Sequence, residues 1–162
     1  MKTIVGVIMF CFFQVGIGLG QNNNQSEAFK EYPEAKKEVK QALDDIENYI
    51  RNNETDNLIA MHAYGPKFTE FEVGGMRQGS KENEDFERNF LGTITEVEKW
   101  NWDDLQINVF GGDVANVTFH SDFKFSRDKE DYNMQMQGTL LFVKTDQGWK
   151  IVHEHLAPIN QE

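Results

Sequence analysis

The chain has a single cysteine, Cys11, which lies in the apolar part of an N-terminal leader. Residues 1–20 carry one lysine, then an apolar run, then the small residues Gly18 and Gly20 ahead of Gln21. This order is typical of a secretory signal peptide cleaved before Gln21. Because cleavage removes the cysteine, we expect an exported chain without disulfides, thiol nucleophiles or thiolate metal ligands, whose stability depends on packing.

The sequence also lacks a long hydrophobic run. The longest stretch, from Ile4 to Phe13, has ten residues, whereas a helix that crosses a bilayer needs roughly 20. This length favours a cleaved signal over an uncleaved anchor. We therefore expect a secreted or periplasmic protein that has no membrane contact after cleavage.

Basic residues are scarce. The chain has 16 Lys and Arg against 27 Asp and Glu, a formal net charge of -11, and no basic run with interleaved aromatics. A negative field of this size repels phosphate backbones and anionic lipid surfaces. The composition therefore argues against nucleic acid as a partner.

Removal of residues 1–20 leaves 142 of the 162 residues, which is enough for one domain and too few for two. We assign residues 21–32 to a flexible polar leader and residues 33–160 to the domain. Apolar residues recur at helical spacing from Pro33 to about Asn52. A second, shorter helix follows, capped by Asn53 and continuing through Met61, and a third runs from Ser80 to Gly92.

Alternation with a period of two predicts strands in the rest of the chain. One short strand, from Lys67 to Val73, precedes the third helix and turns at Gly74-Gly75. After that helix we expect extended chain over 93–110, bent near residues 102–104, then strands over 114–126 and 132–144 and a final strand. The predicted fold class is α+β, with three N-terminal helices packed on a strongly curved, mostly antiparallel sheet.

Several short sequence motifs resemble those of a known family. They are Met61-His62 before the Phe68-containing strand, Gly79-Ser80-Lys81, Gly112-Asp113-Val114-Ala115, and the closing stretch from Thr139 to His155. Over residues 35–157 the chain resembles the SnoaL-like branch of the nuclear transport factor 2-like superfamily. The resemblance implies a cone-shaped fold with a sheet around a pocket, often dimeric, in a family of polyketide cyclases, ketosteroid isomerases, dehydratases and domains without chemistry.

Alternation along the strands predicts the pocket wall. On the strand over 114–126, Phe119 and Phe123 share one face, which we expect to meet the helices. On the last strand, Trp149 shares a side with His153 and His155, and Glu154 points away. We therefore expect the two histidines on the wall of a pocket lined by Tyr64, Trp100, Trp102, Phe119, Phe123 and Trp149.

Three interpretations of His153 and His155 remain open. Either could carry a proton as a catalytic acid or base, since histidine titrates near neutral pH. Either could be a structural residue that bonds an acceptor inside the pocket. Metal ligation needs a third ligand, recruited by folding from His62, Glu70 or Glu72; we expect no bound metal and no cofactor.

The leading functional hypothesis is an exported domain that binds a small apolar or aromatic molecule. A cofactor-independent isomerase, cyclase or dehydratase using His153 or His155 is the enzymatic alternative, and a dimerisation or scaffold module is the third. Asp122 faces away from the predicted pocket, which argues against a ketosteroid-isomerase mechanism. We expect a homodimer through the uncovered sheet face that carries Thr118, His120 and Asp122.

Overall fold

The structure is a computed structural model that describes residues 26–72 and 75–159. The predicted signal peptide, its cleavage site and residues 21–25 of the polar leader lie outside these residues. The helical elements, in chain order, are the 3-10 turn η1 (Glu27–Phe29), α1 (Pro33–Arg51), α2 (Thr55–Ile59), α3 (Ser80–Phe90) and the 3-10 turn η2 (Leu91–Thr93). The strands are β1 (Thr69–Glu72), β2 (Gly75–Gln78), β3 (Ile94–Phe110), β4 (Val114–Arg127), β5 (Glu130–Thr145) and β6 (Gly148–Pro158).

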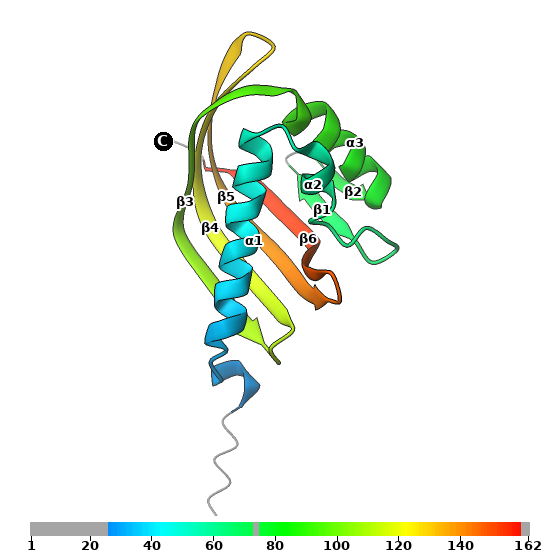
Figure 1. Ribbon diagram of the computed structural model, residues 1–162, viewed down its shortest axis with the longest axis vertical. Coiled ribbons are helices and arrows are strands. Elements are labelled where there is room, and N and C mark those ends of the chain that lie inside the picture. Colours follow the sequence, from blue (N-terminus) through cyan, green and yellow to red (C-terminus); the bar gives the residue numbers. More distant parts are fainter. Residues whose placement is uncertain (1–25, 73–74, 160–162) are drawn as a thin grey trace, which may run out of the picture.

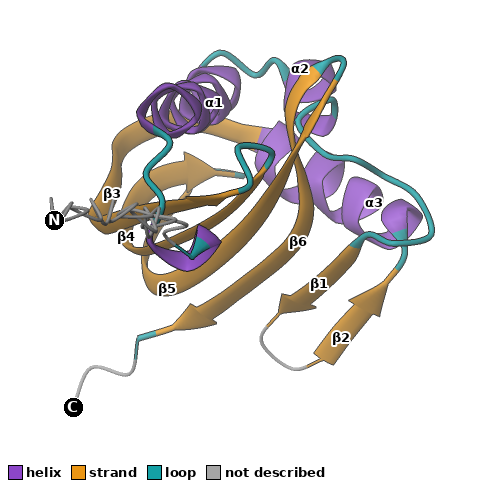
Figure 2. Ribbon diagram, turned by 90° about the horizontal axis from the view of Figure 1, so that it is seen from below, coloured by secondary structure: helices purple, strands orange, loops and turns teal. Residues whose placement is uncertain are grey.

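The described strands form one six-stranded sheet in the order β2-β1-β6-β5-β4-β3. Neighbouring strands are antiparallel except β1 and β6, which run parallel. The sheet is strongly curved, and the helices lie inside the curve (Figures 1 and 2). This arrangement confirms the predicted α+β class.

Helix α1 closes much of the concave side of the sheet. Pro33 occupies its first turn, where a missing backbone N–H has no cost. Its buried side chains fall on one stripe: Ala35, Val39, Ala42, Leu43, Ile46 and Ile50. Full burial of a valine, leucine or isoleucine side chain stabilises the fold by about 1.5–3 kcal/mol. The hydrophobic spacing in the sequence thus positions α1 over the sheet.

The predicted faces of β4 are confirmed. Ala115, Val117, Phe119, Phe123 and Phe125 are all buried on the concave side. The predicted bend in β3 also exists, because the pairing with β4 shifts register between residues 103 and 106. These odd-numbered positions of β4 form the floor of the core.

The predicted face of the histidines on β6 is wrong. Leu141 pairs with His153 and the next residue, Phe142, pairs with Ile151, so Val152 is an extra residue in a β-bulge. A bulge exchanges the two faces of a strand for all residues that follow it. Glu154 is therefore buried on the concave side with Ile151, and His153 and His155 face outward.

Smaller differences concern the turns. Residues 75–78 form a strand, β2, that pairs with β1, where the sequence predicted only a turn at Gly75. Ser80 does not cap α3; its Oγ accepts from the N–H of Gly65 at 2.6 Å and donates to the carbonyl of Gly65 at 3.2 Å. Asn53 has a positive φ of 56° and lies one residue before the cap position of α2.

Candidate functional site

An apolar cavity of about 220 Å³ lies between the helices and the sheet. Four of the predicted pocket residues, Trp100, Trp102, Phe119 and Phe123, line it. The remaining apolar lining comes from all three α-helices and the inner sheet face: Ile46, Ile50, Leu58, Phe86, Phe90, Leu91, Phe125, Met134, Met136, Leu140, Ile151 and Leu156. This volume lies below the roughly 300 Å³ at which sites for drug-sized ligands begin, so the cavity suits a smaller molecule.

Trp149 and Tyr64 lie outside the cavity lining. The Trp149 indole Nε1 donates to Glu38 Oε2 on α1 at 2.9 Å, so this ring joins β6 to the helix. Tyr64 stacks on the imidazole of His62, with centroids 5.0 Å apart and an interplanar angle of 6°. Tyr64 therefore packs against His62 at the polar end of the cavity without lining the cavity itself.

Every polar residue of the cavity lining lies in one group, the acid–histidine cluster, defined as His62, Glu70, Glu87 and Glu154. All four side chains are buried, with exposed fractions of 8%, 3%, 7% and 7%. They come from four places in the chain: the segment after α2, β1, α3 and β6. The fold, and no local motif, brings them together.

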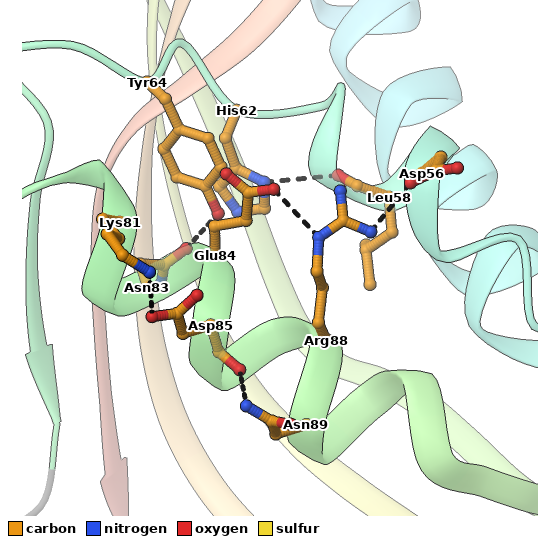
Figure 3. A network of polar contacts seen from close by, with 10 residues as sticks. All are labelled: Asp56, Leu58, His62, Tyr64, Lys81, Asn83, Glu84, Asp85, Arg88 and Asn89. Carbon is orange, nitrogen blue, oxygen red and sulfur yellow. Dashed lines mark hydrogen bonds and ion pairs between the residues drawn. The ribbon is translucent and has the colours of Figure 1, made fainter.

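Asn83 holds the cluster in place. It is fully buried on α3, one turn before Glu87. Its amide Nδ2 donates to Glu70 and, at 3.3 Å, to Glu154 Oε2, while its Oδ1 accepts from the hydroxyl of Tyr64. Figure 3 shows Tyr64 reaching Asn83 on α3, with His62 beside the tyrosine ring. One buried amide thus fixes the orientation of two carboxylates.

Both ring nitrogens of His62 face oxygen acceptors. Nδ1 lies 3.2 Å from the carbonyl oxygen of Leu58 (Figure 3), and Nε2 lies 3.3 Å from Glu154 Oε1. Burial lowers the pKa of His62, but the charge of Glu154, its hydrogen bond and the charge of Glu87 outweigh burial and raise the pKa to about 9. Burial, followed by the charges of Glu87 and Glu154, raises the pKa of Tyr64 well above its ordinary value, so its hydroxyl remains a donor.

An exposed ion-pair group outside the cluster links α2 to α3. The Arg88 guanidinium donates to Asp56 at 2.7 Å and to Glu84 at 2.9 Å (Figure 3). Exposed pairs of this kind contribute little to stability. They join α2 to α3, the helix that carries Asn83 and Glu87.

The structure does not bring His153 and His155 to the cavity. The Nδ1 of His153 lies 2.8 Å from Thr69 Oγ1 on β1, and its ring contacts Phe71 edge to face. His155 is exposed and borders a polar depression on the outer face beside His120. The residue between them, Glu154, is the one that enters the cavity.

Sequence reasoning missed Asn83, Glu87 and Glu154 as site residues, and it considered Glu70 only as a metal ligand. Two signals were present. Glu70 shares a strand face with buried Phe68, and Asn83 and Glu87 lie four residues apart on α3. Glu154 could not be placed, because nothing local in the sequence indicates the bulge at Val152.

The cluster can hold a polar group and move a proton on it. Three carboxylates can accept protons, and burial beside an apolar cavity strengthens every electrostatic interaction there. The described residues that line the cavity include no lysine or arginine. The polar end is therefore acidic, and it suits a donor group or a cation.

Comparison with known proteins identifies the family. Residues 39–161 match the SnoaL-like domain, and the chain belongs to this family. A comparison with curated proteins finds no match. In the described part of the chain, no helix has the length and apolar character needed to cross a membrane.

Solved structures share the nuclear transport factor 2-like fold. A candidate dehydratase of this family from Streptomyces avermitilis has a TM-score of 0.68 and 15% identity, covering 80% of this chain and 99% of that one. A candidate scytalone dehydratase from Novosphingobium aromaticivorans has a TM-score of 0.65 and 16% identity, covering 76% and 83%. The CaMKII hub homology domain from Chlamydomonas reinhardtii has a TM-score of 0.62 and 18% identity, covering 78% and 99%.

Proposed function

We propose that the protein binds a small, largely apolar or aromatic molecule in its cavity, with a hydrogen-bonding end against the acid–histidine cluster. The observation that carries this proposal is the separation of the lining into apolar walls and one buried polar end. Such a pocket orients a ligand, because the walls accept its body and the few polar groups fix one end. In a pure scaffold we would expect side chains to fill this space, whereas this protein has a cavity of about 220 Å³.

Two neighbouring leucines on β5 offer a matched test. Leu140 lines the cavity, and Leu141 lies on the opposite face of the same strand. We expect calorimetry to show 2-naphthol binding one-to-one to the wild type and to Leu141→Trp, and at least tenfold more weakly to Leu140→Trp, because the indole occupies the cavity. Equal affinity in both variants, or no binding of 2-naphthol, indole or p-cresol to the wild type, contradicts the proposal.

A second candidate function is proton transfer on the bound molecule, as in a cofactor-independent isomerase or dehydratase. The buried carboxylates beside the cavity favour it, as do the names of two structural relatives, which are candidate dehydratases. Glu70 is the proton acceptor in this proposal, since it lines the cavity and Asn83 fixes it. A carboxylate removed from water is a stronger base than one in solution.

5-Nitrobenzisoxazole tests this second function without knowledge of the substrate. A base removes the proton on C3, the C–H electrons form a nitrile, and the N–O bond breaks to give a coloured phenolate. We expect the wild type to accelerate this elimination and Glu70→Gln to slow it at least tenfold, with exposed Glu82→Gln as the control. A rate that Glu70→Gln leaves unchanged refutes the assignment of Glu70.

We also propose export by the N-terminal leader and assembly as a homodimer. The support for export is the leader pattern before Gln21. The support for the dimer is the outer face of β4, where Thr118, His120 and Asp122 lie opposite the helices. Measurements for both are given in the Discussion.

A further inference from the structure

We propose that His62, Glu87 and Glu154 bind a divalent metal ion, with zinc as the best fit, at the polar end of the cavity. One nitrogen or oxygen donor from each residue lies within 4.8 Å of the others, and all three residues are buried. One imidazole and two carboxylates are ligands that zinc accepts, and catalytic zinc sites commonly combine three protein ligands with one open position. This proposal goes beyond the pocket's function and does not depend on it.

The spacing of His62 and Glu154 suits a shared metal. Their facing atoms, Nε2 and Oε1, are 3.3 Å apart, which is longer than the usual N–H···O distance of about 2.9–3.0 Å. Zinc bonds of about 2.0–2.1 Å place the donors of a tetrahedron about 3.3–3.4 Å apart. These two donors therefore already have the separation that one zinc ion requires. The carboxylate oxygen of Glu87 lies within 4.8 Å of both, so a small side-chain movement brings it to the same separation.

His62 is oriented as a metal-binding histidine usually is. Its Nδ1 donates to the carbonyl of Leu58, which directs Nε2 towards the cluster and selects the tautomer with a lone pair on Nε2 when metal binds. Tyr64 stacks on one face of the ring. Phe68 meets the same ring edge to face, with the two ring centroids 5.8 Å apart. The imidazole therefore has little freedom to turn away.

The outer contacts of Glu154 support the same arrangement. Asn83 donates to Oε2 of Glu154, which leaves Oε1, the oxygen nearest His62, directed at the proposed ion. Hydrogen bonds of this kind fix a ligating carboxylate. Zinc would take the place of the Nε2 proton of His62 and balance two carboxylate charges. Glu70, which accepts from Asn83, is not one of the proposed ligands.

The test uses the whole protein, stripped with a chelator and titrated with zinc against a chromophoric competitor. We expect one zinc per chain, a higher melting temperature with zinc, and at least tenfold weaker binding in His62→Gln, Glu87→Gln and Glu154→Gln. Each is close in shape to the native residue. The controls, His120→Gln on the outer face and exposed Glu82→Gln on α3, should bind zinc like the wild type.

X-ray absorption at the zinc edge gives an independent measurement, with nitrogen and oxygen ligands at about 2.0–2.1 Å and an imidazole contribution that His62→Gln removes. Absence of zinc binding, or binding that the three cluster variants leave unchanged, overturns the proposal. The 2-naphthol assay on metal-free protein separates the two ideas. A wild type that binds 2-naphthol but no zinc refutes only the metal site, and a wild type that binds zinc but no 2-naphthol refutes only the pocket's function.

Discussion

Asn83 should be among the most sensitive positions in the protein, and Asn83→Leu tests this. The change keeps a similar shape but removes the amide that donates to Glu70 and Glu154 and accepts from Tyr64. A hydrogen bond to a charged group contributes about 1.5–3 kcal/mol, so the loss of two lowers the free energy of unfolding by about 3–6 kcal/mol. This is a large part of the roughly 5–15 kcal/mol that stabilises a typical domain.

Urea unfolding followed by circular dichroism measures the change, with exposed Asn89→Leu on the same helix as the control, expected within about 0.5 kcal/mol of wild type. Tyr64→Phe should cost about 0.5–1.5 kcal/mol alone. In a double-mutant cycle, Tyr64→Phe and Asn83→Leu should couple by about 0.5–3 kcal/mol. A loss below about 1 kcal/mol for Asn83→Leu, or additive variants, would refute the view that Asn83 organises the cluster.

Three further predictions concern packing, export and assembly. Gly138→Ala places a Cβ 2.3 Å from Phe119 Cζ and should destabilise the fold by about 1–3 kcal/mol. Gly65→Ala, whose Cβ would meet nothing within 4 Å, should be close to neutral. Thermal melts that give equal melting temperatures for the two variants contradict this prediction. Intact-mass measurement of the protein from its native host should show a start at or near Gln21, and a retained leader in the membrane fraction argues against export. Light scattering at micromolar concentration should give a dimer for wild type and a monomer for Thr118→Arg, and a monomeric wild type excludes that interface.

The sequence predicted the elements whose signals are local. The hydrophobic stripe of α1 and the alternation along β4 both lie within one element, and the structure confirms them. Phe119 and Phe123 line the cavity for the same reason, since both follow the unbroken alternation of β4. Trp100 on β3, which also lines the cavity, is the pairing partner of Phe123. Periodicity succeeds wherever a strand stays regular.

The polar end of the cavity could not be predicted in the same way. One extra residue, Val152, reverses the faces of β6, so the argument that placed His153 and His155 inside instead applies to Glu154. The remaining cluster members depend on contacts between distant segments; the hydrogen bond between His62 and Glu154 spans 92 positions of the chain. No local pattern encodes such a contact.

The most direct test of the account is a crystal structure of the protein soaked with 2-naphthol. We expect the fused rings inside the cavity, against Trp100 and Phe123, with the hydroxyl within hydrogen-bond distance of Glu70 or Glu154. Rings bound only on the outer face beside His155, or a cavity filled by the protein's own side chains, would contradict the central claim that this cavity and its acidic end form the ligand site.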